Sequence, residues 1–192
     1  MARTNISVDR SVFEEFSRCA QMQNKTLFAF ANESLATTSK ICAEGGNPSD
    51  LYRMWRSISL LKQIDVITLP SEFVDDLIGR LYKGDREGTL KMFQELGASL
   101  VGLLKIIAKD IDGLAETAKD FMLILPVKSL KVTSGGPGEI EISIVGAGRR
   151  IESTQCTFEF VKSVLNGYGY DTVGHEIGIG TIQLRATRRS SY

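Results

Sequence analysis

The sequence Arg3-Thr4-Asn5-Ile6-Ser7-Val8, followed by two apolar-periodic runs that reach Glu44, decides how this chain is organised. Polar and apolar side chains alternate over residues 3–8, which is typical of a β-strand with one exposed face. From Ser11 the apolar residues recur at helical spacing, and a polar turn at residues 23–26 separates this run from the second one. One short strand and two short helices cannot bury a core alone. The segment therefore predicts a dimer in which two strands pair and the helices interlock.

The polar face of the predicted strand carries Arg3, Asn5 and Ser7, with apolar or β-branched residues between them. Arginine can pair with O6 and N7 of guanine, asparagine with N6 and N7 of adenine, and serine with several base edges. Over residues 3–44 this arrangement resembles the ribbon-helix-helix family of DNA-binding proteins. The resemblance implies an intertwined homodimer that inserts a two-stranded β-ribbon into the major groove of double-stranded DNA, where Arg3, Asn5 and Ser7 read bases.

The resemblance also implies contacts to the DNA backbone. Thr26 would cap the second helix, whose free N–H groups would face a phosphate, and Lys25 would add a further phosphate contact. Basic and acidic residues balance over residues 1–44, however, so the segment lacks the general electrostatic footprint of a DNA binder. The alternative for residues 3–8 is an ordinary edge strand of a larger sheet.

The whole chain has the composition of a globular protein. Of its 192 residues, 43% are hydrophobic and 24% are charged, and the formal net charge is zero. A zero net charge argues against a bulk polyanion binder but not against a small reading surface. The cysteines are widely spaced and His175 is the only histidine, so we expect no metal site and no cofactor. We expect a reducing, cytoplasmic location and no membrane association, because no apolar run is long enough to span a bilayer.

Beyond the first segment the sequence predicts two further parts. Gly45-Gly46-Asn47-Pro48 reads as a linker that ends a first domain at residue 46. Residues 47–120 read as a helical connector or dimerisation segment. Its longest helix, residues 86–109, carries a heptad-like apolar seam that suits either core packing or a contact between subunits. In the same connector, Trp55 is expected to anchor packing between domains or subunits.

From residue 121 to residue 192 the apolar period changes from helical to two, which predicts an α+β domain with an antiparallel sheet. The expected strands cover residues 122–125, 129–133, 139–144, 171–175 and 179–187, with a helix over residues 153–166. By size and position this part resembles the sensor or oligomerisation domains appended to some ribbon-helix-helix regulators. A small-molecule effector for it cannot be named from the sequence.

The remaining motifs carry no recognisable chemistry. The glycine-rich stretches at 135–138 and 146–148 match neither dinucleotide nor phosphate-loop patterns. His175 beside Glu176 lacks a nucleophile placed by sequence, so we predict no enzyme, although an enzyme centred on the C-terminal sheet is a third class. The sequence predicts an α+β protein that regulates transcription as a homodimer or higher homo-oligomer. The alternative is a dimeric ligand- or protein-binding module whose N-terminal segment serves only for dimerisation.

Overall fold

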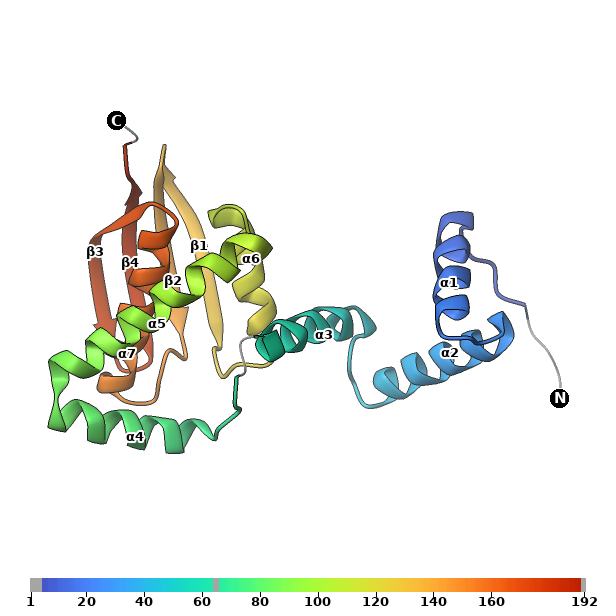
Figure 1. Ribbon diagram of the computed structural model, residues 1–192, viewed down its shortest axis with the longest axis horizontal. Helices are drawn as coiled ribbons and strands as arrows, with labels where there is room; N and C mark the ends of the chain where they lie inside the picture. The colour runs from blue at the N-terminus through green and yellow to red at the C-terminus, as the bar shows by residue number, and fades with distance from the viewer. Residues whose placement is uncertain (1–4, 64–65, 191–192) are drawn as a thin grey trace. The chain divides into compact units, whose positions relative to one another are not determined.

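The computed structural model describes residues 5–63 and 66–190, and within them the chain is α+β (Figure 1). The described residues form seven helices and one four-stranded antiparallel sheet, and the strands all belong to the C-terminal part. The chain divides into two compact units, Met1–Tyr52 and Arg53–Tyr192, here called the first and the second unit. The expected domain limits at residues 46 and 120 stay predictions.

The first unit contains a helical hairpin, as the sequence predicts. Helix α1 (Arg10–Met22) and helix α2 (Leu27–Ala43) are joined by a short turn in which Asn24 adopts a left-handed backbone conformation with φ 54°. Asparagine tolerates this region better than most residues, so the turn is compatible with its sequence. The rings of Phe16 and Phe30 pack against each other with centroids 4.6 Å apart and join the two helices.

The predicted N-terminal strand is not formed in the single chain. Arg3 and Thr4 lie outside the described residues, and residues 5–9 belong to no strand or helix. A strand exists only when its backbone N–H and C=O groups bond to a neighbouring strand, and the described part of this chain offers none at this point. The helix pair of the expected ribbon-helix-helix unit is therefore present, whereas its ribbon is not.

Four helices follow, and each of the last three begins where the sequence supplies a start signal. They are α3 (Pro48–Gln63), which begins in the first unit and ends in the second, α4 (Ser71–Gly84), α5 (Arg86–Ile107) and α6 (Ile111–Phe121). Helix α4 follows Pro70. The carboxylate of Asp85 accepts the N–H of Gly88 at 2.9 Å, and that of Asp110 accepts the N–H of Gly113 at 2.8 Å. These N-caps separate helices that the apolar pattern alone would run together.

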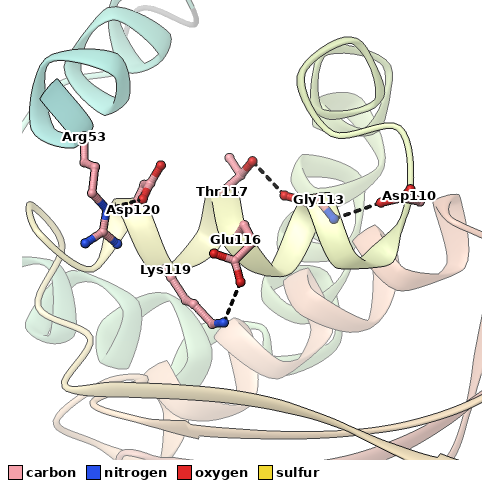
Figure 2. Close-up of polar contacts among 7 residues, drawn as sticks. All are labelled: Arg53, Asp110, Gly113, Glu116, Thr117, Lys119 and Asp120. Atoms are coloured by element: carbon pink, nitrogen blue, oxygen red, sulfur yellow. Dashed lines mark hydrogen bonds and ion pairs between the residues drawn. The ribbon is translucent and has the colours of Figure 1, made fainter. Parts of the chain in front are cut away.

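Helix α6 is fixed by the polar contacts drawn in Figure 2. Its Asp120 accepts from Nε of Arg53 on α3 at 2.7 Å, which joins two segments of the second unit that are 67 residues apart in the sequence. On the exposed side, Lys119 and Glu116 form an ion pair at 2.7 Å. The strand predicted at residues 122–125 is wrong, because this apolar run continues from α6 as a turn in which the Leu125 N–H bonds the Phe121 carbonyl at 2.8 Å. A short apolar run suits a buried strand and a buried helix end equally well.

The C-terminal part confirms the predicted order of two strands, a helix and two strands. Its elements are β1 (Ser129–Gly136), β2 (Glu139–Val145), α7 (Ile151–Gly167), β3 (Tyr170–Gly178) and β4 (Thr181–Arg188). The strand order is β1-β2-β4-β3, so β1 and β3 form the edges. Both edge strands have a break in register, between Ser134 and Gly136 in β1 and between Thr172 and Gly174 in β3.

The core of the second unit lies between one face of this sheet and α7. Alternate residues of β2 and β4 point inward and are buried, in agreement with the period of two. Phe158 and Leu165 of α7 complete this core, and Figure 1 shows α7 and α5 on the same side of the sheet. Gly97 of α5 lies so close to α7 that a Cβ atom there would be 2.6 Å from the Phe160 carbonyl oxygen. The apolar seam of α5 therefore packs within one chain. None of the described helices has the length and apolarity that a bilayer crossing needs.

Candidate nucleic-acid interface

The expected base-reading residues lie in the segment that precedes α1. Arg3 lies outside the described residues. Asn5 and Ser7 are both exposed in the non-helical segment before α1. The residue that links this segment to the helix, Asp9, has extended backbone with φ −61° and ψ 145°.

The apolar residues of this segment are exposed as well. Ile6 is 65% exposed and Val8 is 58% exposed. In α1 and α2 only Ala20 is buried, while large apolar side chains on both helices face solvent. Over residues 5–44 the exposed large apolar residues are Ile6, Val8, Val12, Phe13, Met22, Phe28 and Leu35. A unit of this size with a single buried apolar side chain leaves its large apolar side chains exposed to solvent. In proteins, such exposed apolar surface marks an interaction site.

Thr26 is the N-cap of α2, as the sequence predicts. Its Oγ1 accepts the N–H of Ala29 at 3.2 Å, and its carbonyl accepts the N–H of Phe30 at 3.0 Å. The positive end of the helix dipole lies at this terminus, where an anion is favoured. The cap thus fixes where α2 begins and leaves the outward side of its first turn available for a phosphate.

Lys25, the other expected phosphate ligand, has partners within its own unit. Its Nζ forms an ion pair with Oε2 of Glu33 on α2 and lies 6.0 Å from the centroid of the Phe30 ring. A phosphate contact would have to share or replace the Glu33 carboxylate. Arg18 on α1 is exposed and has no ion pair within the described residues, a feature that the sequence pattern did not single out.

The exposed face of the sheet in the second unit holds a second candidate site. A hollow of about 400 Å³ lies over the strands, and its polar lining includes Lys131, Glu141, Glu176 and Arg185. The guanidinium of Arg185 lies across Gly174, where an added Cβ atom would be 3.4 Å from Nη2. Among the described residues these four side chains make no ion pair, although Glu141 and Arg185 are direct cross-strand neighbours.

His175 and Glu176 do not form an acid–base pair. The imidazole packs against the ring of Phe158 on α7 with centroids 4.5 Å apart, and His175 pairs with the inward-facing Leu184. Glu176 pairs with Gln183 on the exposed face. Adjacent residues of a strand point to opposite faces, so the sheet separates the two side chains.

The basic residues near the C-terminus are held within the second unit. Arg185 and Arg188 belong to β4, and Arg189 bonds Asp171 at 2.6 Å. The hydrogen bond from Arg189 lowers the pKa of Asp171 below its ordinary value. Arg185 and Arg188 are therefore part of the sheet of the second unit, and Arg189 is bonded to strand β3 through Asp171.

A buried carboxylate that the sequence did not reveal lies at the start of α7. Asp75 of α4 is 5% exposed, and its two oxygens are 3.4 and 3.3 Å from the backbone N of Arg149. Arg150 pairs with the neighbouring Asp76. The turn that follows the glycine-rich stretch 146–148 thus offers the Arg149 amide to a carboxylate of the same chain. The sequence alone does not indicate this hydrogen bond, because Asp75 and Arg149 are 74 residues apart.

The three cysteines have different surroundings. Cys19 on α1 and Cys42 on α2 are exposed. Cys156 is buried in α7, and burial, followed by the charges of Glu152 and Glu159, raises its pKa to about 11. A thiol with so high a pKa is a poor nucleophile at neutral pH. Within residues 5–63 and 66–190 no group of acidic, histidine and cysteine side chains could hold a metal ion.

Comparisons of the chain with protein-family models, with curated proteins and with solved structures give no match.

Proposed function

We propose that this protein is a sequence-specific DNA-binding regulator of transcription that acts as a homodimer through its first unit. The observation that carries the proposal is the uncovered apolar surface of α1, α2 and the segment before them. The turn at Asn24 and the Thr26 cap give this helix pair a defined shape, yet Ala20 is its only buried side chain. A second copy of the same unit supplies the missing cover.

Pairing of the N-terminal segments supports this arrangement in two ways. Two copies of residues 3–8 in an antiparallel ribbon would give each other's backbone groups hydrogen-bond partners. Ile6 and Val8 would then turn toward the helices, and each buried side chain contributes about 1.5–3 kcal/mol to association. This dimer agrees with the alternating pattern in the sequence.

The same ribbon would expose its polar face. Arg3, Asn5 and Ser7 would point away from the helices of both subunits, into the major groove of double-stranded DNA. The capped start of α2 at Thr26 would approach a backbone phosphate. Lys25 would contribute only when its ion pair with Glu33 opens or is shared, so we assign positioning chiefly to Thr26.

The test is fluorescence anisotropy of the full chain against duplexes selected from a random-sequence pool, over a series of salt concentrations. The variant Arg3/Asn5/Ser7→Ala is compared with a matched control, Lys91/Glu95→Ala, which alters exposed residues of α5. We expect saturable binding by the parent and the control, and its loss in the triple variant. Sedimentation equilibrium should find the same mass for all three proteins.

The result that overturns the proposal is a folded dimer that binds no duplex even at low salt. Equal affinity of the triple variant and the parent would also contradict it.

A second function has one observation in its favour. The hollow of about 400 Å³ on the sheet carries unpaired charges of both signs, which suits a small polar ligand. In this alternative the first unit serves only for dimerisation and the second unit binds the ligand or a protein. In the first function the same hollow is where an effector of the regulator would bind. A dimer that survives in the absence of any DNA binding would favour the alternative.

A further inference from the structure

The outer face of the sheet carries two rows of side chains that form the floor of the hollow of about 400 Å³. Each row follows the cross-strand pairs from β1 to β3, in the order of the strands in the sheet. The first row is Lys131, Ser143, Gln183 and Glu176, and the second is Thr133, Glu141, Arg185 and Gly174. Each row contains one cation and one carboxylate, so the two rows together have no net charge.

The side chain of Arg185 is turned away from Glu141, its direct neighbour on β2. Residues directly opposite in an antiparallel pair have Cβ atoms about 5 Å apart, which is within reach of an ion pair. The guanidinium lies instead over Gly174 of β3, where an added Cβ atom would be 3.4 Å from Nη2 and 3.6 Å from Nε. A glycine permits this position because it has no side chain on the outer face. Within residues 5–63 and 66–190 the Glu141 carboxylate is left without an ion pair.

A second carboxylate lies on the side toward which Arg185 is turned. Glu176 is on the same face of β3, two positions beyond Gly174. Positions two apart along a strand are separated by about 6.8 Å. Arg185 and Glu176 are both exposed, and neither has an ion pair in the part of the chain that the structure describes. A small molecule can therefore accept from the guanidinium with one group and donate to Glu176 with another.

A ligand with a single charge suits this surface poorly. An anion bound at Arg185 would lie between the carboxylates of Glu141 and Glu176, and a cation bound at Glu141 would lie between Lys131 and Arg185. Like charges at this range repel each other. A molecule that carries both charges meets the opposite sign at each end. Charge complementarity thus favours a zwitterion.

We propose that the hollow binds a free α-amino acid, with its carboxylate on Arg185 and its ammonium group on Glu176. A guanidinium holds a carboxylate through two parallel hydrogen bonds. Both charged groups of an α-amino acid are attached to one carbon atom, so one small molecule reaches both residues. Its own side chain then extends over Ser143 toward Glu141, where a polar group is favoured. A hollow of about 400 Å³ is at the small end of ligand sites, as this ligand requires.

The inference rests on the ligand-binding role proposed for the hollow and is independent of DNA binding by the first unit. The first experiment titrates the full chain with each common L-amino acid by isothermal titration calorimetry at low salt. The best binder is then compared with its N-acetyl derivative and its carboxamide, each of which lacks one of the two charges. We expect saturable binding of one amino acid per chain. Each derivative should bind about tenfold more weakly or worse.

The second experiment assigns each charge of the ligand to one residue. Arg185→Gln should weaken binding about tenfold or more, and it should bind the amino acid and the carboxamide equally, because the group that distinguishes them is gone. Glu176→Gln should abolish the preference for the free amino acid over the N-acetyl derivative in the same way. Arg188→Gln is the matched control, because it lies on β4 outside the hollow, and it should bind as the parent does.

A third variant tests the position of the guanidinium. Gly174→Val would place a side chain where the guanidinium lies, so it should weaken binding as much as Arg185→Gln does. Circular dichroism and the midpoint of thermal unfolding should match the parent in the Arg185 and Glu176 variants, because both side chains are exposed.

The inference is overturned if the folded parent binds no amino acid, if a derivative with one charge binds as tightly as the amino acid, or if binding survives Arg185→Gln. Its failure can be told apart from failure of the regulator. Binding of an amino acid by a chain that binds no duplex leaves the inference intact. Binding of a duplex by a chain that takes up no amino acid refutes the inference alone.

Discussion

A single buried carboxylate joins two segments that lie 74 residues apart in the chain. Asp75 on α4 accepts the Arg149 N–H at the entrance to α7, where the first helical N–H groups have no partner in the preceding turn. The sequence displays this residue only as one of a pair of acids on an amphipathic helix. Which of the two is buried depends on where α7 begins in space, and no local pattern carries that information.

Replacing Asp75 with Ala should destabilise the protein by about 1–3 kcal/mol, because the change removes a buried carboxylate that is the acceptor of the Arg149 N–H. Asp75→Asn should cost less, since its amide oxygen can still accept. The measurement is urea-induced unfolding followed by circular dichroism.

The neighbouring Asp76→Ala is the matched control. It removes a half-exposed ion pair with Arg150, and such pairs contribute at most about 1 kcal/mol. An Asp75 variant no less stable than the Asp76 variant would show that the buried contact contributes little.

At the scale of elements, helices and hairpins were predictable where the apolar period is clear and turn residues bound it. The hairpin between β1 and β2 follows from the glycines around Pro137, and α2 begins at the predicted Thr26 cap. The apolar run at residues 122–125 was misassigned because four consecutive apolar residues carry no period. Residues 5–9 form no strand in the single chain, because a strand needs the backbone groups of a neighbouring strand and an alternating pattern alone supplies none.

Two glycines of α5 should respond oppositely to the same substitution. Gly97→Ala should cost about 1–3 kcal/mol, because the new Cβ atom would lie 2.6 Å from the Phe160 carbonyl and force α5 away from α7. Gly102 has nothing within 4 Å of an added Cβ atom, so Gly102→Ala should stabilise by up to about 1 kcal/mol through helix propensity.

Thermal unfolding of the two variants beside the parent measures both changes. Equal shifts of the midpoint in one direction would contradict the close contact between α5 and α7.

At the scale of the whole molecule, the two units differ in how they are stabilised. The second unit has a continuous core of isoleucine, leucine and phenylalanine between its sheet and α7, whereas the first unit buries one alanine in its helices. The sequence predicted both kinds of unit, since residues 121–192 supply a sheet and a helix that can cover each other, whereas one short strand and two short helices cannot bury a core alone. It did not locate the hollow on the sheet, because the residues that line it come from all four strands.

Dilution should therefore affect the units differently. On lowering the protein concentration about a hundredfold, amides of α1 and α2 should exchange faster with solvent deuterium, because the proposed dimer of the first unit would dissociate by mass action. Amides of β2 and β4 should keep their protection. Hydrogen exchange followed by mass spectrometry resolves the two sets, and unchanged protection of α1 and α2 would mean that the first unit is stable alone.

The irregular edges of the sheet limit how copies of this protein can aggregate. An unbroken edge strand is a template onto which a foreign strand can add, and chains of such additions lead to fibres. In β1 and β3 the breaks at Ser134/Gly136 and Thr172/Gly174 interrupt the row of backbone donors and acceptors that an added strand would need. The two breaks should therefore hinder growth of the C-terminal sheet from molecule to molecule. A concentrated solution of this protein should resist the formation of fibres that grow from its sheet edges.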